Sequence, residues 1–330
     1  MMRTSALRVS AAMSAATLAA RRPAPHSVRD QALAGLRSDA KTLPAALFYD
    51  ARGAELFERI CETAEYYPTR TEIGILDRYA GEIAAMAGPR TALIEYGSGA
   101  GVKVRFLLDR LMDAAAYVPV DISREQLVQV AGERSRQYPA IPIRPVCADY
   151  TAPFELPALP AGARRVAFFP GSTIGNFHPT EAAAFLHRVR HAVGPGGALV
   201  LGVDRRKDER VLHAAYNDAG GVTAAFNLNL LARLNREVGA QFDLGAFRHL
   251  AFFNDAASRI EMHLESQRDQ TVCVGGVPVA FRRGETIHTE CSYKYDEERL
   301  DALVRAAGFR VERLWTDARE WFWVGFLVPG

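Results

Sequence analysis

The spacing of apolar residues changes along the chain and predicts different kinds of structure. From Val28 to about Gly88, apolar residues recur at helical spacing, with polar breaks at residues 50–53 and 66–70. After residue 90, short apolar runs alternate with amphipathic stretches, which favours a mostly parallel sheet with helices on both faces. The expected strands are residues 92–96, 117–120, 143–147, 166–169 and 198–203.

The alternation stops after the fifth expected strand and returns near the end of the chain. A long helical pattern containing Phe226 and Val238 comes first, and two strand-like stretches follow at 259–264 and 286–295. We therefore predict one α/β sheet domain that is interrupted by an inserted second domain. The final elements are an expected helix at 297–307 and expected strands at 310–316 and 322–328.

A glycine-rich turn, Glu95-Tyr96-Gly97-Ser98-Gly99-Ala100-Gly101, closes the first expected strand. Glycines adopt turn dihedrals closed to other residues, and open sheets bind ligands at the carboxyl ends of their strands. A dinucleotide-binding turn favours GxGxxG, but Val102 stands where its third glycine would be. In the helix expected next, Val102, Phe106, Leu107 and Leu111 form one apolar stripe.

Acidic residues near this turn favour S-adenosylmethionine as its ligand, because that cofactor has no phosphates and carries a cationic amino acid end. Asp121 ends the second expected strand, where a carboxylate accepts hydrogen bonds from ribose hydroxyls. Asp149 ends the third, where it can meet the adenine amino group. The predicted cofactor contacts are Glu95, Gly97, Ser98, Gly99, Asp121, Asp149 and Tyr150.

Charge is balanced over the whole chain but not along it. The 330 residues contain 40 Lys+Arg and 38 Asp+Glu, a net charge of +2. Residues 1–29 hold five arginines and no acidic residue, so the rest of the chain carries −3 and a nucleic-acid partner is not expected. We expect residues 1–29 to be a disordered leader. A targeting segment and a mis-assigned start share this composition, and both stay open.

Signals for membranes and metals are weak. No run of about 18 apolar residues predicts a membrane span. The four cysteines form no CxxC motif and the eight histidines form no HExxH or HxH pattern, so we expect neither a metal nor a disulfide framework. We expect a cytoplasmic monomer.

Six short motifs, in order, resemble one methyltransferase family. The motifs are Phe48-Tyr49-Asp50, Glu65-Tyr66-Tyr67-Pro68-Thr69-Arg70-Thr71-Glu72, Gly171-Ser172-Thr173-Ile174-Gly175-Asn176, Tyr216 with Asp218, Ile260-Glu261-Met262 and Thr289-Glu290-Cys291-Ser292. Over about residues 30–330 the chain resembles the ergothioneine-pathway L-histidine N-alpha-methyltransferases. The resemblance implies a class I, Rossmann-like fold that depends on S-adenosylmethionine. It also implies trimethylation of L-histidine to hercynine, the first step of ergothioneine biosynthesis.

The resemblance also implies roles at the reacting amine. Asn176 and Tyr216 would hold the α-amino and carboxylate ends of L-histidine, and Tyr49 would lie beside the amine, so Tyr49 and Asn176 are the catalytic candidates. Lys103 matches a lysine that follows the glycine turn in the family, and it joins the predicted cofactor contacts. Ala100-Gly101-Val102 departs from the threonine, serine and acidic residue of some members, which leaves the details of this loop open.

Four further residues are implied to surround the imidazole ring. Tyr66 would pack near the ring, Met262 would flank it, and Glu290 and Ser292 would hydrogen-bond it. Ordinary core packing is the alternative for Met262, because its neighbours at alternate positions are apolar.

The residues themselves give an independent reason to group part of this set. Alternate side chains of a strand face the same side, so Glu290 and Ser292 share a face with His288 and Lys294. A carboxylate and a hydroxyl on one patch suit a ligand with two ring nitrogens. A solvated strand face is the alternative.

Two other functions remain open. One is N-methylation of another aromatic amino acid, of tryptophan type, on the same fold, and the other is a regulator that binds S-adenosylmethionine without catalysis.

The domain prediction combines these patterns. The predicted parts are a leader at 1–29, an N-terminal helical part of the substrate domain at 30–70, a cofactor-binding domain at 71–204, an inserted substrate-binding domain at 205–294 and a return to the sheet at 295–330.

Overall fold

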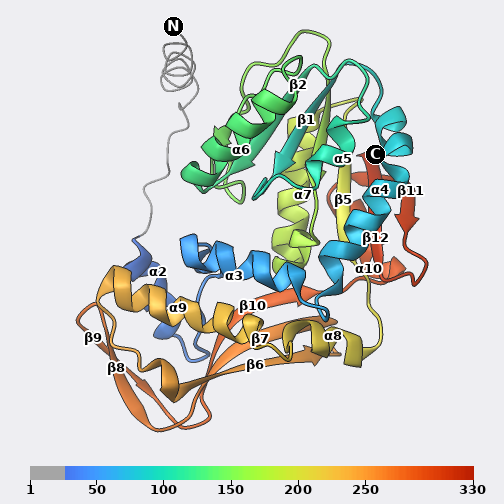
Figure 1. Ribbon diagram of the computed structural model, residues 1–330. Coiled ribbons are helices and arrows are strands. Elements are labelled where there is room, and N and C mark those ends of the chain that lie inside the picture. Colours follow the sequence, from blue (N-terminus) through green and yellow to red (C-terminus); the bar gives the residue numbers. More distant parts are fainter. Residues whose placement is uncertain (1–26) are drawn as a thin grey trace, which may run out of the picture.

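A seven-stranded sheet forms the first lobe of the molecule (Figure 1). The computed structural model describes residues 27–330. Strands β1 to β5 are parallel, whereas β12 and β11 add an antiparallel hairpin beside β5. This arrangement confirms the predicted, mostly parallel α/β fold. In spatial order the strands are β11 (Phe309–Thr316), β12 (Phe322–Pro329), β5 (Ala198–Asp204), β4 (Arg164–Phe169), β1 (Thr91–Tyr96), β2 (Ala116–Asp121) and β3 (Val146–Cys147).

Helices cover both faces of this sheet, because alternate residues of each strand point to opposite sides. All six residues of β1 are buried. Leu93 belongs to the core under helices α4 and α5, whereas Ile94 belongs to the core under α7 and α10. The helices of this lobe are α4 (Tyr67–Ala87), α5 (Val104–Leu108), α6 (Arg124–Gln137), α7 (Pro179–Val193) and α10 (Glu297–Ala306).

The helix after the glycine turn is shorter than its pattern predicts. It buries Val104, Leu107 and Leu108, whereas Val102, which was expected on the apolar stripe, is 50% exposed. The prediction was wrong only for Val102, because the turn, with Gly101 at a φ of 65°, continues to the start of α5. Leu107 is buried, and Phe106 and Leu111 pack against the same core, as predicted.

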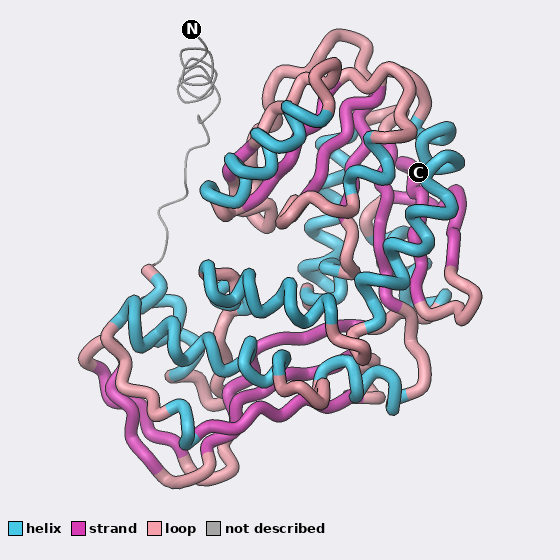
Figure 2. Tube along the Cα trace, in the orientation of Figure 1, coloured by secondary structure: helices cyan, strands magenta, loops and turns pink. Residues whose placement is uncertain are grey.

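The second lobe combines the N-terminal helices with the inserted segment (Figures 1 and 2). Phe48 and Leu56 share its core with Leu230 and Ile260 of the insertion. Strands β10, β7 and β6 form an antiparallel sheet, and β8 and β9 form a hairpin. The elements are α2 (Val28–Leu36), η1 (Ala45–Phe48), α3 (Ala51–Glu62), α8 (Glu209–Tyr216), α9 (Val222–Val238), η3 (Leu244–Ala246), β6 (Phe247–Asn254), β7 (Arg259–Ser266), β8 (Gln270–Val274), β9 (Val277–Phe281) and β10 (Thr286–Tyr293).

The predicted helix breaks of this lobe need correction. Residues 51–53 form the first turn of α3, and Asp50 caps that helix by accepting a hydrogen bond from the Gly53 backbone N–H at 2.7 Å. Pro68 lies in the first turn of α4, where a proline is tolerated because the first N–H groups of a helix have no intrahelical partner. Both segments that were expected to be breaks are therefore largely helix starts.

The limits of the leader and the insertion also differ from the prediction. Residues 1–26 of the expected leader lie outside the described residues, and Val28 and Arg29 belong to α2. The insertion contains five strands rather than two, because β8 and β9 have only five residues each and β6 mixes exposed and buried positions irregularly. Within residues 27–330, no helix is long and apolar enough to span a bilayer.

A β-bulge in β10 changes which residues share a face. His288 pairs with His263 of β7, but Glu290 pairs with the preceding residue, Met262, so Thr289 is an extra residue in β10. His288 therefore stacks on His263 with ring centroids 4.8 Å apart, on the side of the sheet opposite Glu290. The prediction that His288 shares the face of Glu290 was wrong for this reason.

Candidate active site

The glycine turn after β1 forms a backbone cradle at the carboxyl end of the sheet. Gly97, Gly99 and Gly101 have φ angles of 69°, 46° and 65°, which favour glycine. A Cβ on Gly97 would lie 3.4 Å from the Tyr150 hydroxyl oxygen. Among the described residues, nothing hydrogen-bonds the buried hydroxyl of Ser98. The cradle thus contains a polar atom that a ligand can satisfy.

Acidic side chains flank the cradle as the sequence predicts. Asp121, at the end of β2, accepts hydrogen bonds from the backbone N–H groups of Gly99 at 3.0 Å and Ser123 at 2.9 Å. Asp149 follows β3 and accepts from the Thr151 backbone N–H at 2.9 Å. Carboxylate acceptors beside a glycine cradle fit the ribose and adenine of S-adenosylmethionine.

Glu95 lies below this cradle and is bonded within the protein. It is 2% exposed, and its carboxylate accepts a hydrogen bond from the Tyr117 hydroxyl of β2. Burial raises the pKa of Glu95 to about 8, which the Tyr117 bond and nearby cations only partly oppose. A direct contact between Glu95 and the cofactor therefore stays a prediction.

Lys103, the basic residue predicted beside the turn, is also paired within the protein. Its Nζ atom lies 2.6 Å from Glu72 of α4, a fully buried carboxylate. Glu72 also accepts a hydrogen bond at 2.9 Å from the backbone N–H of Gly171, in the turn after β4. This ion pair therefore connects the predicted cofactor turn to the turn that leads to Asn176.

All seven predicted substrate residues line one pocket where the two lobes meet. Asn176 ends η2 (Thr173–Asn176), the 3-10 turn after β4 in the first lobe. The remaining six come from the second lobe and the start of α4. Among the described residues, no hydrogen bond reaches the Asn176 side-chain amide or the Glu290 carboxylate. The residues are Tyr49, Tyr66, Asn176, Tyr216, Met262, Glu290 and Ser292.

A buried hydrogen-bond network fixes the hydroxyl of Ser292. Its oxygen accepts hydrogen bonds from the Tyr216 hydroxyl at 2.8 Å and from Lys294 Nζ at 2.7 Å. Since both bonds use its lone pairs, the Ser292 proton is free to be donated to a ligand. Tyr216 has only one proton, so it can donate to a substrate carboxylate only by turning away from Ser292.

Lys294 is itself held in place by a buried charge. Its Nζ atom lies 2.9 Å from Asp204, at the end of β5, and both side chains are 1% exposed. Burial favours the neutral amine, but Asp204 outweighs this effect and raises the pKa of Lys294. The ammonium therefore remains charged beneath the pocket.

Aromatic rings form one wall of the pocket. The ring centroids of Tyr49 and Phe57 lie 6.1 Å apart, those of Phe57 and Tyr66 lie 6.3 Å apart, and those of Tyr66 and Tyr216 lie 6.2 Å apart, all edge to face. Phe226 closes the row at 6.3 Å from Tyr49. Aromatic faces attract alkylammonium groups, so this wall suits an amine that gains methyl groups.

Sequence reasoning missed several residues of the pocket. Lys294 continues the alternation of Glu290 and Ser292, and Asp204 ends the fifth strand much as Asp121 ends the second, so both had a detectable signal. Phe57, Thr223 and Phe226 had none, because amphipathic helices carry such residues on any buried face.

The Glu290 carboxyl has an unusual acidity that gives a testable pH dependence. Removal from water raises the pKa of Glu290 to about 7, although the charge of Lys294 opposes the shift. Because the folded state favours the protonated form, Glu290 contributes stability below its ordinary pKa of 4.5. This contribution is lost as the pH rises to about 7.

We therefore expect the protein without substrate to lose part of its protonated carboxyl infrared band as the pH rises through about 7, while the part that belongs to Glu95 persists to about pH 8. The Glu290→Gln variant should lack this change, and its free energy of unfolding should fall less between pH 4.5 and pH 7 than that of the parent chain. Identical infrared titrations for the two proteins would contradict the assignment.

Comparison with known proteins shows which family the chain resembles. Residues 28–329 match the model of a family described as "Histidine-specific methyltransferase, SAM-dependent". The chain is 43% identical over 299 residues to a histidine N-alpha-methyltransferase of Mycolicibacterium smegmatis, covering 89% of this chain and 92% of that protein.

Two more distant relatives cover a similar share of the chain. Ergothioneine biosynthesis protein 1 of Neurospora crassa is 32% identical, over 85% of this chain and 32% of that protein. A 4-dimethylallyltryptophan N-methyltransferase of Aspergillus fumigatus is 29% identical, over 88% of this chain and 90% of that protein. With a glycine cradle, a pocket where the two lobes meet and a family match over nearly its whole length, the chain belongs to the histidine-specific, S-adenosylmethionine-dependent methyltransferases.

Proposed function

We propose that the protein transfers three methyl groups to the α-amine of L-histidine and so forms hercynine for ergothioneine biosynthesis. The observation that carries this proposal is the pairing of Glu290 and Ser292 in one pocket. Glu290 offers an acceptor without a partner among the described residues, and Ser292 offers a free proton. A neutral imidazole needs one acceptor for its N–H and one donor for its other nitrogen. The name of the bacterial relative supports the same substrate, and the name of the Neurospora relative supports the same pathway.

The cofactor site contributes position and acceptors. S-adenosylmethionine supplies a methyl group on a positively charged sulfur. The backbone of Gly97 to Gly101 and the carboxylates of Asp121 and Asp149 would hold the cofactor at the edge of the sheet. Glu72 and Lys103 would keep this edge at a fixed distance from the substrate turn, because they bond to both.

The chain's own residues must present a neutral amine in the right direction. The reference pKa of an α-amine is about 8, so this group is largely protonated near neutral pH. The amine would lose its proton to water or a nearby group on binding. The Asn176 amide and the Tyr49 hydroxyl would then orient its lone pair, and such alignment is a major source of rate in a displacement reaction.

The aromatic wall would act on the charge that appears during the reaction. Positive charge moves from the sulfur to the nitrogen, which ends as a quaternary ammonium that cannot donate a hydrogen bond. The rings of Tyr49, Phe57 and Phe226 would stabilise that charge by cation–π attraction, worth about 1 kcal/mol. Tyr49 is 45% exposed, so its ring is accessible to a ligand.

Mass spectrometry tests the proposal directly. Purified protein with S-adenosylmethionine and an equimolar mixture of the twenty amino acids should yield L-histidine heavier by three methyl groups. Methylated tryptophan as the main product would support the tryptophan-type alternative instead. Cofactor binding without any methylated amino acid would support a regulator and overturn the proposed activity.

Glu290→Ala tests the recognition of the imidazole. The change leaves a buried ring N–H unpaired, so we expect L-histidine affinity to fall by about 1–3 kcal/mol, roughly 5- to 150-fold. Isothermal titration calorimetry measures the loss, with Glu312→Ala on the exposed edge of β11 as the control. Equal L-histidine affinity in both variants would sink the role of Glu290.

Tyr49→Phe tests the orientation of the amine. Loss of one hydroxyl hydrogen bond should raise the activation free energy by about 1 kcal/mol, which lowers kcat roughly fivefold. The affinity for S-adenosylmethionine should stay unchanged. Tyr79→Phe is a matched control, because Tyr79 lies on α4 and packs against Trp315 of β11, away from the pocket. An unchanged kcat in Tyr49→Phe would refute the role.

A further inference from the structure

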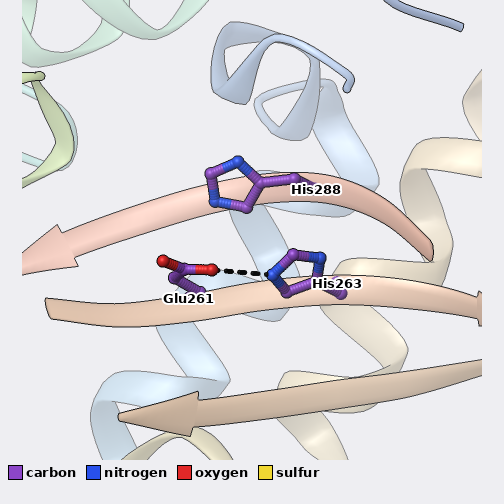
Figure 3. Close-up of side chains that lie close together, drawn as sticks. All are labelled: Glu261, His263 and His288. Carbon is purple, nitrogen blue, oxygen red and sulfur yellow. Dashed lines mark hydrogen bonds and ion pairs between the residues drawn. The ribbon is translucent and has the colours of Figure 1, made fainter. Parts of the chain in front are cut away.

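The face of the second sheet opposite the substrate pocket carries a group of metal-ligand side chains (Figure 3). Glu261 and His263 alternate on β7, and the bulge brings His288 of β10 over them. One ligand atom from each of the three residues lies within 4.8 Å of the other two. The methyl-transfer proposal uses none of these side chains.

A fourth donor lies beside this group. The Cys291 sulfur is 3.2 Å from His288 Nε2, and Glu261 Oε2 is 3.1 Å from His263 Nε2. Zinc binds nitrogen and oxygen at about 2.0–2.2 Å and sulfur at about 2.3 Å, so tetrahedral ligand atoms are separated by about 3.3–3.6 Å. Two of the separations are close to this range. The other atoms must move closer by side-chain rotation, starting from ligand atoms of Glu261, His263 and His288 that lie within 4.8 Å of one another.

Neighbouring groups already orient the Glu261 carboxylate. Its Oε1 atom accepts hydrogen bonds from Arg259 Nε at 2.8 Å and from Asn254 Nδ2 at 2.9 Å, which directs Oε2 toward the histidines. Such supporting bonds are usual for a carboxylate that binds a metal.

The imidazoles are also partly removed from water. The His263 side chain is 12% exposed and the Glu261 side chain 10%. His263 Nδ1 is buried and, among the described residues, has no hydrogen-bond partner. Phe252 stacks on the outer side of His263, with ring centroids 5.3 Å apart, and His288 stacks on the inner side. The two histidine rings are therefore held together in a defined, half-buried place.

We propose that Glu261, His263, His288 and Cys291 form a binding site for a zinc-class transition-metal ion on the back of the substrate-binding sheet. Two imidazoles, one carboxylate and one thiolate are borderline-soft donors, which favour Zn²⁺ or Co²⁺ over Mg²⁺ or Ca²⁺. The expectation of no metal from the sequence rested on motif spacing, and it did not allow for residues that β-pairing brings together.

Cobalt binding to the full chain without a histidine tag tests this site. A second histidine pair, His187 and His191 on α7, has Nε2 atoms 3.1 Å apart, so the test uses the His187→Gln chain. We expect one Co²⁺ per chain, intense visible bands of tetrahedral geometry, and a near-ultraviolet sulfur-to-cobalt band. Added Zn²⁺ should abolish all of these bands by displacement.

Variants in the same background separate the ligands. His288→Gln should weaken Co²⁺ binding by at least about tenfold. Cys291→Ser should remove the sulfur band and keep the visible bands. Circular dichroism and unchanged S-adenosylmethionine affinity verify folding. No stoichiometric binding in the His187→Gln chain, or equal affinity after His288→Gln, would overturn the site, and a sulfur band that persists in Cys291→Ser would remove Cys291 from it.

Discussion

Replacing Asn176 with alanine is expected to lower kcat/KM for L-histidine by about a hundredfold or more. The amide has no competing partner among the described residues, and we propose that it bonds the carboxylate and the neutral α-amine of the amino acid. A hydrogen bond to the charged carboxylate contributes about 1.5–3 kcal/mol and one to the neutral amine about 0.5–1.5 kcal/mol, which together correspond to about two orders of magnitude. Steady-state kinetics with varied L-histidine measures the effect.

The local structure explains why the amide has a fixed position. A Cβ on Gly175 would lie 2.8 Å from the Tyr293 carbonyl oxygen, so η2 packs directly on β10. Ser172 has a φ of 55°, and its hydroxyl accepts a hydrogen bond at 2.8 Å from the backbone N–H of Asp204. Asn176 is thus placed by backbone contacts that the alanine variant keeps.

Two controls accompany the Asn176→Ala variant. Its S-adenosylmethionine affinity and melting temperature should equal those of the parent chain. Gln129→Ala removes an exposed amide on α6 and should leave kcat/KM unchanged. A loss of less than threefold in Asn176→Ala would contradict its proposed role.

Asp204→Asn should cause the largest loss of stability, about 3–5 kcal/mol. Asp204 is fully buried and binds the Tyr67 hydroxyl at 2.7 Å, Lys207 at 2.6 Å and Lys294 at 2.9 Å. Burial lowers the pKa of Lys207 to about 8, but Asp204 keeps the amine largely charged at neutral pH. Removing the carboxylate charge leaves two buried ammonium groups without compensation, and breaking a buried pair in this way has a cost of that size.

Denaturant unfolding measures this loss against two matched variants. Asp301→Asn breaks an exposed ion pair with Arg305 and should cost no more than about 1 kcal/mol. Adding Lys294→Met to Asp204→Asn removes one of the unpaired charges, so the double variant should be more stable than Asp204→Asn alone. If Asp204→Asn and Asp301→Asn had equal stability, the charge network would not hold the fold.

Local sequence was sufficient for the sheet and for the cofactor cradle. Four of the five parallel strands are short apolar runs, and Asp121 ends one of them, so neighbours in sequence carry the information. The strand predicted at 143–147 was too long, because only Val146–Cys147 pair with β2 as a strand. The α5 helix shows the limit of this reasoning. Val102 fits an apolar stripe, but it belongs to the turn, and α5 begins only at Val104.

Prediction of the substrate pocket depended on the family resemblance, because the residues of the pocket come from segments that are far apart in the sequence. Periodicity groups Glu290 with Ser292, but it cannot show that Tyr49 or Asn176 lies near them. Glu72 illustrates the same limit. Nothing in its helical context distinguishes it from a solvated glutamate, yet tertiary packing buries it beside Lys103.

The bulge in β10 separates two tasks within one strand. Thr289 and Glu290 both lie opposite Met262, and Thr289 donates a hydrogen bond to Asn227 of α9 at 2.8 Å. One residue thus anchors the strand while its neighbour is left to meet the ligand. On the proposed function, a substitution at Glu290 would change what the pocket recognises and would leave the anchor and the register of the sheet in place. On the proposed function, position 290 is therefore the first choice for altering by design which amino acid side chain the pocket accepts.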